Sequence, residues 1–167
     1  TTERGRLLLG CRPEAVALST SKRATVAHLE RAGIPVVPTA STVAEIAERP
    51  GRWVIKPDDG AGCEETIVFE SWRAVRESLA LMPKGRCIAQ PWLDGDALSL
   101  SLLCRDGEAR LLSVNRQRME RDGGRLRLAG LEVNALPDHD GQFQLLAQRI
   151  ARALPSLWGY VGVDLIH

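Results

Sequence analysis

Residues 53–63 have the sequence Trp-Val-Ile-Lys-Pro-Asp-Asp-Gly-Ala-Gly-Cys. The apolar start predicts a β-strand, and the proline and glycines predict a loop after it. A lysine ammonium is a point charge that suits phosphate oxygens, and a glycine loop lets backbone N–H groups approach those oxygens closely. The stretch therefore predicts a phosphate site, although a solvated strand end followed by an ordinary turn has the same pattern. The residues of this candidate site are Lys56, Gly60, Ala61, Gly62 and Cys63.

Downstream of this stretch the pattern predicts a hairpin, a helix and a further strand. Residues 66–69 follow the glycine loop closely, which indicates that they form a hairpin with the strand that starts at Trp53. Ser71 is a favoured N-cap residue and predicts the start of a helix. Residues 86–90 predict the next strand.

Upstream, the sequence predicts a short strand and two helices. Residues 6–9 form a short apolar run that ends at a turn. The segment 19–21 offers N-cap side chains for a helix that continues to about Ala32 and ends before a glycine. Ser41 is placed to cap a second helix over residues 42–48.

The C-terminal half is rich in turn signals between strand-like runs. Asp106-Gly107 and Asp122-Gly123-Gly124 each predict a hairpin. A helix is expected over residues 139–154 and a final strand over 160–166. This order of elements predicts an α+β fold, and the turn at residues 83–85 is the best candidate boundary between two subdomains.

The turn after the strand at 86–90 is a second candidate site. Free backbone polar groups at a turn between subdomains can bind the edge of an adenine base, with Trp92 or Leu93 packing nearby. An ordinary turn with an anchoring tryptophan has the same pattern. The residues concerned are Gln90, Pro91, Trp92 and Leu93.

Asp164 lies within the apolar run Val-Gly-Val-Asp-Leu-Ile at residues 161–166. An acid in such a run is costly to bury without a partner or a metal, and Mg²⁺ prefers carboxylate oxygens and bridges phosphates. Strand alternation places Gly162, Asp164 and Ile166 on one face. A magnesium ligand and an acid on the wet face of a half-exposed strand therefore both fit.

The composition is that of an ordinary globular domain. The 167 residues are 44% hydrophobic and 26% charged, with a formal net charge of +1, so no basic field indicates a nucleic-acid partner. The four cysteines form no CxxC pair, which argues against a zinc site. Reduced cysteines and the lack of an apolar run of about 18 residues predict a cytoplasmic protein without a membrane segment. Because the chain starts close to a strand and without Met, we expect it to be a fragment.

Taken in order, these pieces resemble the ATP-grasp superfamily over residues 6–167. The resemblance rests on five segments: Ser21-Lys22 at a helix start, Gly-Ile-Pro-Val-Val-Pro at 33–38, Val-Ile-Lys-Pro-x-x-Gly-x-Gly at 54–62, Ile-x-Gln-Pro-Trp-Leu-x-Gly at 88–95, and Gly-Tyr-Val-Gly-Val-Asp-Leu at 159–165. It implies an ATP-grasp fold, in which two α/β subdomains with mostly antiparallel sheets sandwich the nucleotide. The implied division is the end of a preceding domain at 1–19, a small subdomain at 20–85 and a C-terminal subdomain at 86–167. We expect the last to be truncated, because the family's Glu-x-Asn magnesium ligands would follow His167.

The resemblance also implies a role for each matched position. Lys22 and Lys56 would contact the phosphates of ATP, and residues 60–63 would close over them. Gln90 would open the adenine hinge, where Leu93 offers a backbone contact. Asp164 would be the first ligand of Mg²⁺ or Mn²⁺. An acid that binds the ribose in many relatives would fall near Ala97, where Asp96 is the nearest carboxylate.

The implied activity is that of an ATP-dependent ligase that joins a small-molecule carboxylate to an amine through an acylphosphate. Val-Asn-Arg-Gln at 114–117 is similar to the tyramine–glutamate ligase group of methanofuran-type cofactor synthesis. That similarity would place Asn115 and Arg116 on the acylphosphate or the acid, although an exposed strand arginine has the same pattern. Another ATP-grasp enzyme, such as a carboxylase or a kinase-like member, and a non-catalytic nucleotide-binding domain are the alternatives. A homodimer is compatible with the sequence.

Overall fold

The computed structural model describes residues 2–3, 6–7, 9–60, 63 and 65–167. These residues confirm the predicted α+β class. In chain order the elements are β1 (Thr2–Glu3), β2 (Arg6–Leu7), α1 (Pro13–Ser19), α2 (Lys22–Arg31), the 3₁₀ turn η1 (Val43–Glu45), β3 (Trp53–Pro57), β4 (Ile67–Phe69), α3 (Trp72–Ala80), β5 (Cys87–Pro91), β6 (Ala97–Arg105), β7 (Glu108–Asp122), β8 (Arg125–Leu136), α4 (Gln142–Ala153) and β9 (Gly159–Ile166).

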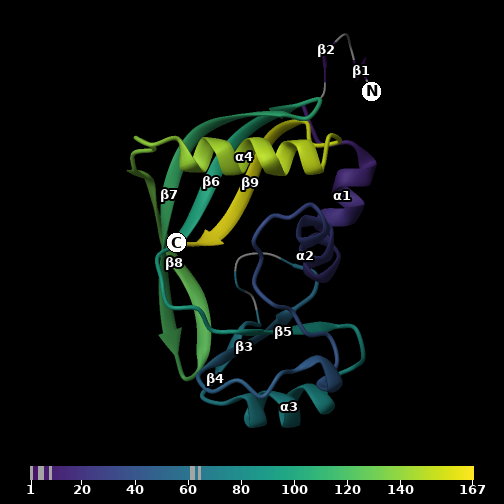
Figure 1. Cartoon of the computed structure of the whole chain (residues 1–167), viewed down its shortest axis with the longest axis vertical. Coiled ribbons are helices and arrows are strands. Elements are labelled where there is room, and N and C mark those ends of the chain that lie inside the picture. Colours follow the sequence, from purple (N-terminus) through teal and green to yellow (C-terminus); the bar gives the residue numbers. More distant parts are fainter. Residues whose placement is uncertain (1, 4–5, 8, 61–62, 64) are drawn as a thin grey trace.

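The main sheet has seven antiparallel strands in the order β5-β3-β4-β8-β7-β6-β9. The predicted hairpins β3–β4, β6–β7 and β7–β8 are all present. Strands β4 and β8 are paired only at Ile67 and Arg125. The sheet therefore has a small part, β5-β3-β4, and a large part, β8-β7-β6-β9, which the long β7–β8 hairpin connects (Figure 1).

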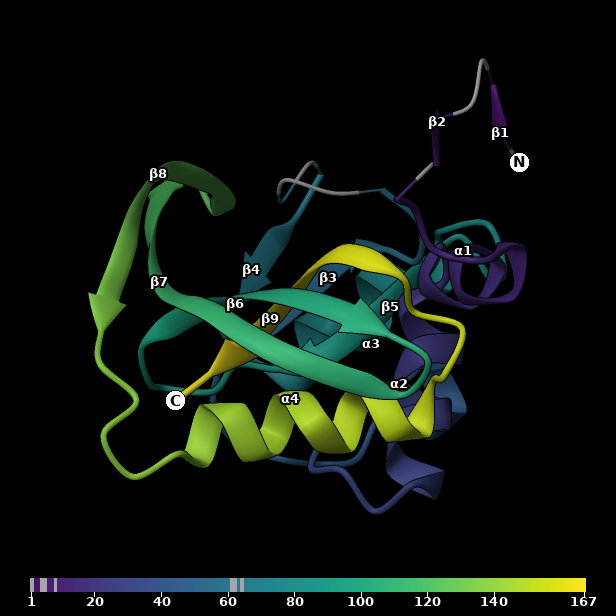
Figure 2. The ribbon, with the colours of Figure 1, turned by 90° about the horizontal axis from the view of Figure 1, so that it is seen from above.

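Each part of the sheet has its own hydrophobic core. Helix α3 covers one face of the small part, where Trp53 and Ile55 pack with Val75. Helix α4 covers one face of the large part, where Leu100 and Val114 pack among residues that include Ala147 and Ile150 (Figure 2). On the opposite face of the small part, Val54 and Ile88 are buried as well.

Two helix predictions are corrected by the structure. Residues 13–19 form helix α1 with Pro13 at its first position, where a proline is well tolerated; the sequence reading placed only a turn there. The helix expected over 42–48 is the single 3₁₀ turn η1. Its Glu45 carboxylate accepts hydrogen bonds from the N–H groups of Ser41 and Thr42, and the chain is already extended at Ile46.

Elements on the two sides of the predicted subdomain boundary at residues 83–85 contact each other. Strand β5, beyond that turn, pairs with β3 before it, and Leu29 of α2 packs against the larger core with α4. The division at 20–85 and 86–167 stays a prediction. No helix of the described residues is long and apolar enough to cross a membrane.

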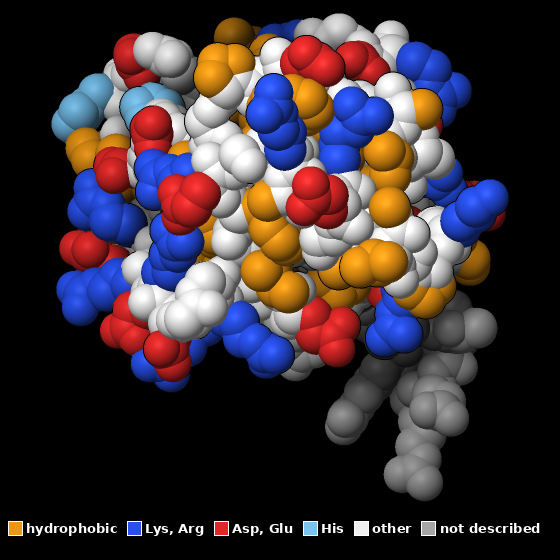
Figure 3. Space-filling model, turned by 90° about the horizontal axis from the view of Figure 1, so that it is seen from below, with side chains coloured by type: hydrophobic (Ala, Val, Ile, Leu, Met, Phe, Trp, Pro, Cys, Tyr) orange, Lys and Arg blue, Asp and Glu red, His pale blue; other side chains and the backbone are white. Residues whose placement is uncertain are grey.

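Basic and acidic side chains are interspersed on the face of the molecule that contains α3 (Figure 3). Apolar side chains lie between them. This mixture agrees with the small net charge of +1.

Candidate functional site

Lys56 lies on the face of the small sheet that points away from α3. Trp53 and Ile55 pack in the α3 core, so alternation along β3 turns Val54 and Lys56 to the opposite face. Register pairs Val54 with Gln90 and Lys56 with Ile88 on β5. The predicted phosphate lysine and the predicted hinge glutamine therefore share one face of the sheet.

Several predicted site residues act on the charge of the Lys56 ammonium. Burial lowers its pKa, and the nearby Lys22 ammonium lowers that pKa further, whereas Cys63 and the Asp164 carboxylate act in the opposite direction. Among the described residues no hydrogen bond to this ammonium is found. Residues from α2, β3, the glycine loop and β9 thus come close enough to act on one charge, which makes it a favourable position for an anion.

The pKa of the Cys63 thiol is shifted in the opposite direction to that of Lys56. Burial raises the pKa of its thiol, and the Lys56 ammonium partly offsets that effect. The thiol is therefore protonated at neutral pH. Gly60 and Cys63 both have left-handed backbones, with φ of +88° and +61°. Ala61 and Gly62, which complete the predicted phosphate loop, lie outside the described residues.

Lys22 holds the start of the same loop. Its ammonium donates to the carbonyl oxygens of Pro57, Asp58, Asp59 and Gly60 at 2.9, 3.3, 3.0 and 3.0 Å. The Asp58 carboxylate accepts hydrogen bonds from the Ser21 hydroxyl at 2.7 Å and from the Arg23 N–H at 2.8 Å. These contacts tie the N-terminus of α2 to the residues directly after Lys56.

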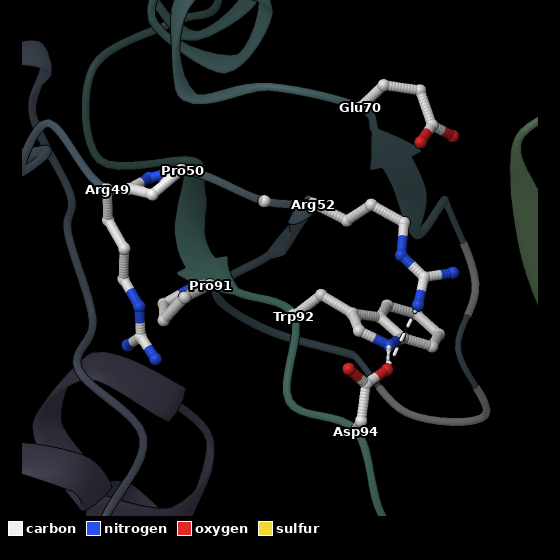
Figure 4. Close-up of a pocket in the computed structure, with 8 residues that line it drawn as sticks. Arg49, Pro50, Arg52, Glu70, Pro91, Trp92 and Asp94 are labelled. Carbon is white, nitrogen blue, oxygen red and sulfur yellow. Dashed lines mark hydrogen bonds and ion pairs between the residues drawn. The ribbon is translucent and has the colours of Figure 1, made fainter.

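The hinge segment borders a polar cavity. Gln90 is buried and donates to Thr39 Oγ1 at 2.7 Å. The Arg52 guanidinium stacks over the Trp92 ring at 4.9 Å, and both side chains hydrogen bond Asp94 Oδ1 at 3.0 Å. A cavity of about 500 Å³ opens here (Figure 4). Its lining residues are Arg49, Pro50, Gly51, Arg52, Glu70, Pro91, Trp92 and Asp94. Leu93 is half-buried beside this cavity lining.

Asp164 lies on the face of the large sheet opposite α4. Val163 and Leu165 pack against the α4 core, and Asp164 between them is exposed. Gly162, Asp164 and Ile166 share one exposed face, as the alternation predicts. Gln117 donates from Nε2 to Asp164 Oδ1 at 2.8 Å. The sequence patterns assign Gln117 no role. Its two-residue spacing from Asn115 is the signal that places it on this face.

Asn115 and Arg116 point to opposite faces of β7. Asn115 is buried, donates to Ser101 Oγ at 3.0 Å and accepts from the Asn134 N–H at 3.0 Å. Arg116 pairs in register with the core residue Leu98. The structure therefore does not bring these two predicted contacts together.

Arg116 and Asp96 meet at the end of the sheet. The Arg116 guanidinium lies 3.5 Å from the Asp96 carboxylate and 3.5 Å from that of Glu132. Asp96 also exchanges both backbone hydrogen bonds with His167, at 2.9 and 3.0 Å. The predicted roles of Asp96 and Arg116 stay predictions.

Solved structures with the same fold come from several enzymes. The D-Ala:D-Ser ligase of Enterococcus faecalis aligns with a TM-score of 0.72 at 19% identity, over 97% of this chain and 52% of its own. N5-carboxyaminoimidazole synthetase of Staphylococcus aureus, solved with ADP, aligns with a TM-score of 0.73 at 16% identity, over 94% and 43%. The L-amino acid ligase of Bacillus licheniformis aligns with a TM-score of 0.65 at 16% identity, over 88% and 36%. This chain therefore spans between about a third and about half of the length of these proteins.

Among proteins with curated functions, none matches the chain. The family described as the ATP-grasp domain matches residues 19–167, which include Lys22, Lys56, Gln90 and Asp164. The chain belongs to the ATP-grasp domain family, and the fold that its five sequence segments predict is confirmed.

Proposed function

We propose that this chain is the nucleotide-binding core of a ligase that uses MgATP to join a carboxylate to an amine. The observation that carries the proposal is geometric: Lys56 shares a sheet face with Gln90, and the Lys22 ammonium is hydrogen-bonded to the loop that follows Lys56. The charges of Lys22 and Asp164 also act on that of Lys56. Two cations beside one carboxylate suit a triphosphate that carries a magnesium ion. The enzymes named above, two of which are ligases by name, support the reaction class.

The Asp164 carboxylate fits a magnesium ion that is bound together with phosphate. The described residues contain no group of three or more side chains that could hold a metal alone. Magnesium often takes only one or two carboxylates when substrate phosphates supply further oxygens. Asp164 would hold the ion through the carboxylate oxygen that Gln117 leaves free. Such oxygen ligands also suit Mn²⁺. Bound there, the ion would neutralise phosphate charge during phosphoryl transfer.

The chain's own residues would bind the nucleotide and protect the intermediate. Lys56 and Lys22 would neutralise the phosphates as the terminal phosphoryl group passes to the substrate carboxylate. The acylphosphate formed would react with the amine and release phosphate. Residues 57–60, held by Lys22, would help to keep water from that intermediate. The adenine would lie at the hinge, toward Trp92 and the cavity.

Replacement of Lys56 tests the proposal. We expect MgATP at millimolar concentration to raise the melting temperature of the wild-type chain, and Lys56→Ala to lose both this shift and ATP-dependent turnover, because the central phosphate charge is gone. Lys84→Ala, which removes an exposed lysine from the turn at 83–85, is the matched control and should behave as wild type. Wild-type nucleotide binding in Lys56→Ala would contradict the proposal.

Trapping with hydroxylamine separates the ligase from its alternatives. Hydroxylamine attacks an acylphosphate and yields a hydroxamate and phosphate, so hydroxamate that depends on an added acid indicates a ligase. Turnover that requires bicarbonate would favour a carboxylase, and nucleotide binding without turnover would favour a binding domain. A more specific proposal is a role in methanofuran-type cofactor synthesis, which rests only on the resemblance at residues 114–117. Glutamate as the acid and tyramine as the amine are the substrates that test it.

A further inference from the structure

One glycine in β9 has no structural reason to be a glycine. Glycine inside a strand weakens it and often marks a position where a ligand approaches closely. Gly162 has no positive φ, and a Cβ added to it would meet no atom of the described residues within 4 Å. Gly159 in the same strand differs, because it has φ of +79° and a Cβ there would lie 2.8 Å from the Leu9 carbonyl oxygen. Neither backbone conformation nor packing therefore requires the missing side chain at Gly162.

The open space above Gly162 lies between the site and an apolar surface. Tyr160, Gly162 and Asp164 point to the same face of β9 by alternation, and all three are exposed. The rise of a strand, about 3.3 Å per residue, puts the Cα atom of Tyr160 about 13 Å from that of Asp164. Gly162 thus lies between Asp164, the proposed magnesium ligand, and the ring of Tyr160, and it leaves the sheet surface between them without a side chain.

Tyr160 and Leu103 form the apolar end of this face. They are cross-strand partners on β9 and β6, and 66% and 48% of their surfaces are exposed. The Tyr160 hydroxyl shares a hydrogen bond of 2.8 Å with Ser101 Oγ, which in turn accepts from Asn115. The ring is therefore held in place across the sheet, with its apolar surface still accessible.

We propose that the surface above Gly162, with Tyr160 and Leu103 at its end, is the subsite for an aromatic or large aliphatic group of the organic substrate. This inference rests on the proposed function, because it places the reacting end of the substrate beside Asp164 and Lys56. The apolar group belongs either to the acid or to the amine. Burial of one side of a phenyl ring on this surface should strengthen binding about tenfold.

Matched ligand pairs test the subsite. The MgADP complex is titrated by calorimetry with 3-phenylpropanoate against acetate, and with 2-phenylethylamine against methylamine. We expect one phenyl compound to bind about tenfold more tightly than its short partner, and the pair that shows this difference identifies the source of the group. If neither phenyl compound binds more tightly than its partner, the proposal is wrong.

Substitution of Gly162 decides whether the preference arises at this surface. Gly162→Leu should abolish the phenyl preference while the affinity for MgADP stays within about twofold, because the added side chain enters open space. Gly130→Leu, at the strand glycine of β8, is the control and should keep the preference. Tyr160→Phe should keep it as well, because the ring remains. Gly162→Val, with a residue favoured in strands, replaces the leucine variant if that one does not fold.

The two possible failures are distinct. A phenyl preference that survives in Gly162→Leu overturns the subsite and leaves the nucleotide site intact. Failure of the wild-type chain to bind MgADP overturns the proposed function and the subsite with it.

Discussion

At the scale of single residues, the candidate site depends on a lysine whose charge is unfavourable without a ligand. Lys56 is partly buried beside Lys22, and both effects lower its pKa. An anion bound at this position would relieve them. The lysine that strand and loop patterns single out is thus also the one whose surroundings favour phosphate.

The lowered pKa of Lys56 predicts pH-dependent nucleotide binding. A phosphate ligand favours the protonated ammonium, so affinity for ADP should fall as pH rises through the lowered pKa, before the pH of about 10.4 at which an ordinary lysine titrates. Protons should be taken up on binding in that range, which calorimetry in two buffers of different ionisation enthalpy measures. Lys22, Cys63 and Asp164 are the other groups that act on this charge. Lys56→Arg keeps its charge and should bind ADP without this decline; an equal decline would show that another group titrates.

Gln117 is predicted to act through Asp164. Its amide fixes one carboxylate oxygen at 2.8 Å, and partners of this kind commonly change metal affinity about 10- to 100-fold. Gln117→Met keeps the length of the side chain and removes the donor. We expect it to need a several-fold higher Mg²⁺ concentration for ADP binding, while ADP binding in EDTA is unchanged. Calorimetric titrations with and without Mg²⁺ measure both, and an unchanged Mg²⁺ requirement would show that the contact has no such role.

At the scale of elements, the sequence predicts the starts of α2 and α3 but not the length of the helix expected at 42–48. Ser21 and Ser71 accept the hydrogen bonds expected of N-cap residues, from Ala24 and Ala74. A cap depends on one side chain and nearby N–H groups, so it is a local property. The length of a helix depends on the surface it can bury, which is why the expected helix at 42–48 is only the single turn η1.

Asp58 is predicted to stabilise the start of α2. Its carboxylate accepts from the Ser21 hydroxyl and the Arg23 N–H, so Asp58→Ala should lower the free energy of unfolding by about 1 kcal/mol. The neighbouring Asp59 is exposed, and no hydrogen bond to its carboxylate is found in the described part of the chain. Asp59→Ala is therefore the control and should change stability little. Urea unfolding measures both, and equal values would contradict a capping role.

At the scale of the whole molecule, the two parts of the sheet join at the β4–β8 pair, and each part has its own core. The small core surrounds α3 and the large one surrounds α4. Lys56 belongs to the small part and Asp164 to the large part. A nucleotide bound to both would connect the two halves.

This arrangement predicts two levels of amide hydrogen exchange. Without nucleotide, α3 and β3 should exchange faster than β6 and α4, because the smaller core buries fewer side chains. MgADP should slow exchange in β3 and β9 together. Exchange measured by mass spectrometry at the peptide level tests this, and uniform exchange across both parts would show that they open as one unit.

The sequence by itself determined the main strands, the hairpin turns and the caps at Ser21 and Ser71, because each depends on local spacing. An ordered set of short segments singled out Lys22, Lys56, Gln90 and Asp164. Only the tertiary structure decided which of these positions meet. It lets the charges of Lys22 and Asp164 act on that of Lys56, and it turns Asn115 and Arg116 to opposite faces of β7. It also leaves Gly162 facing open space. The relation between Lys56 and Asp164 depends on how β3 and β9 lie relative to each other. These two residues are more than 100 positions apart in the sequence, so no local pattern indicates how close they are.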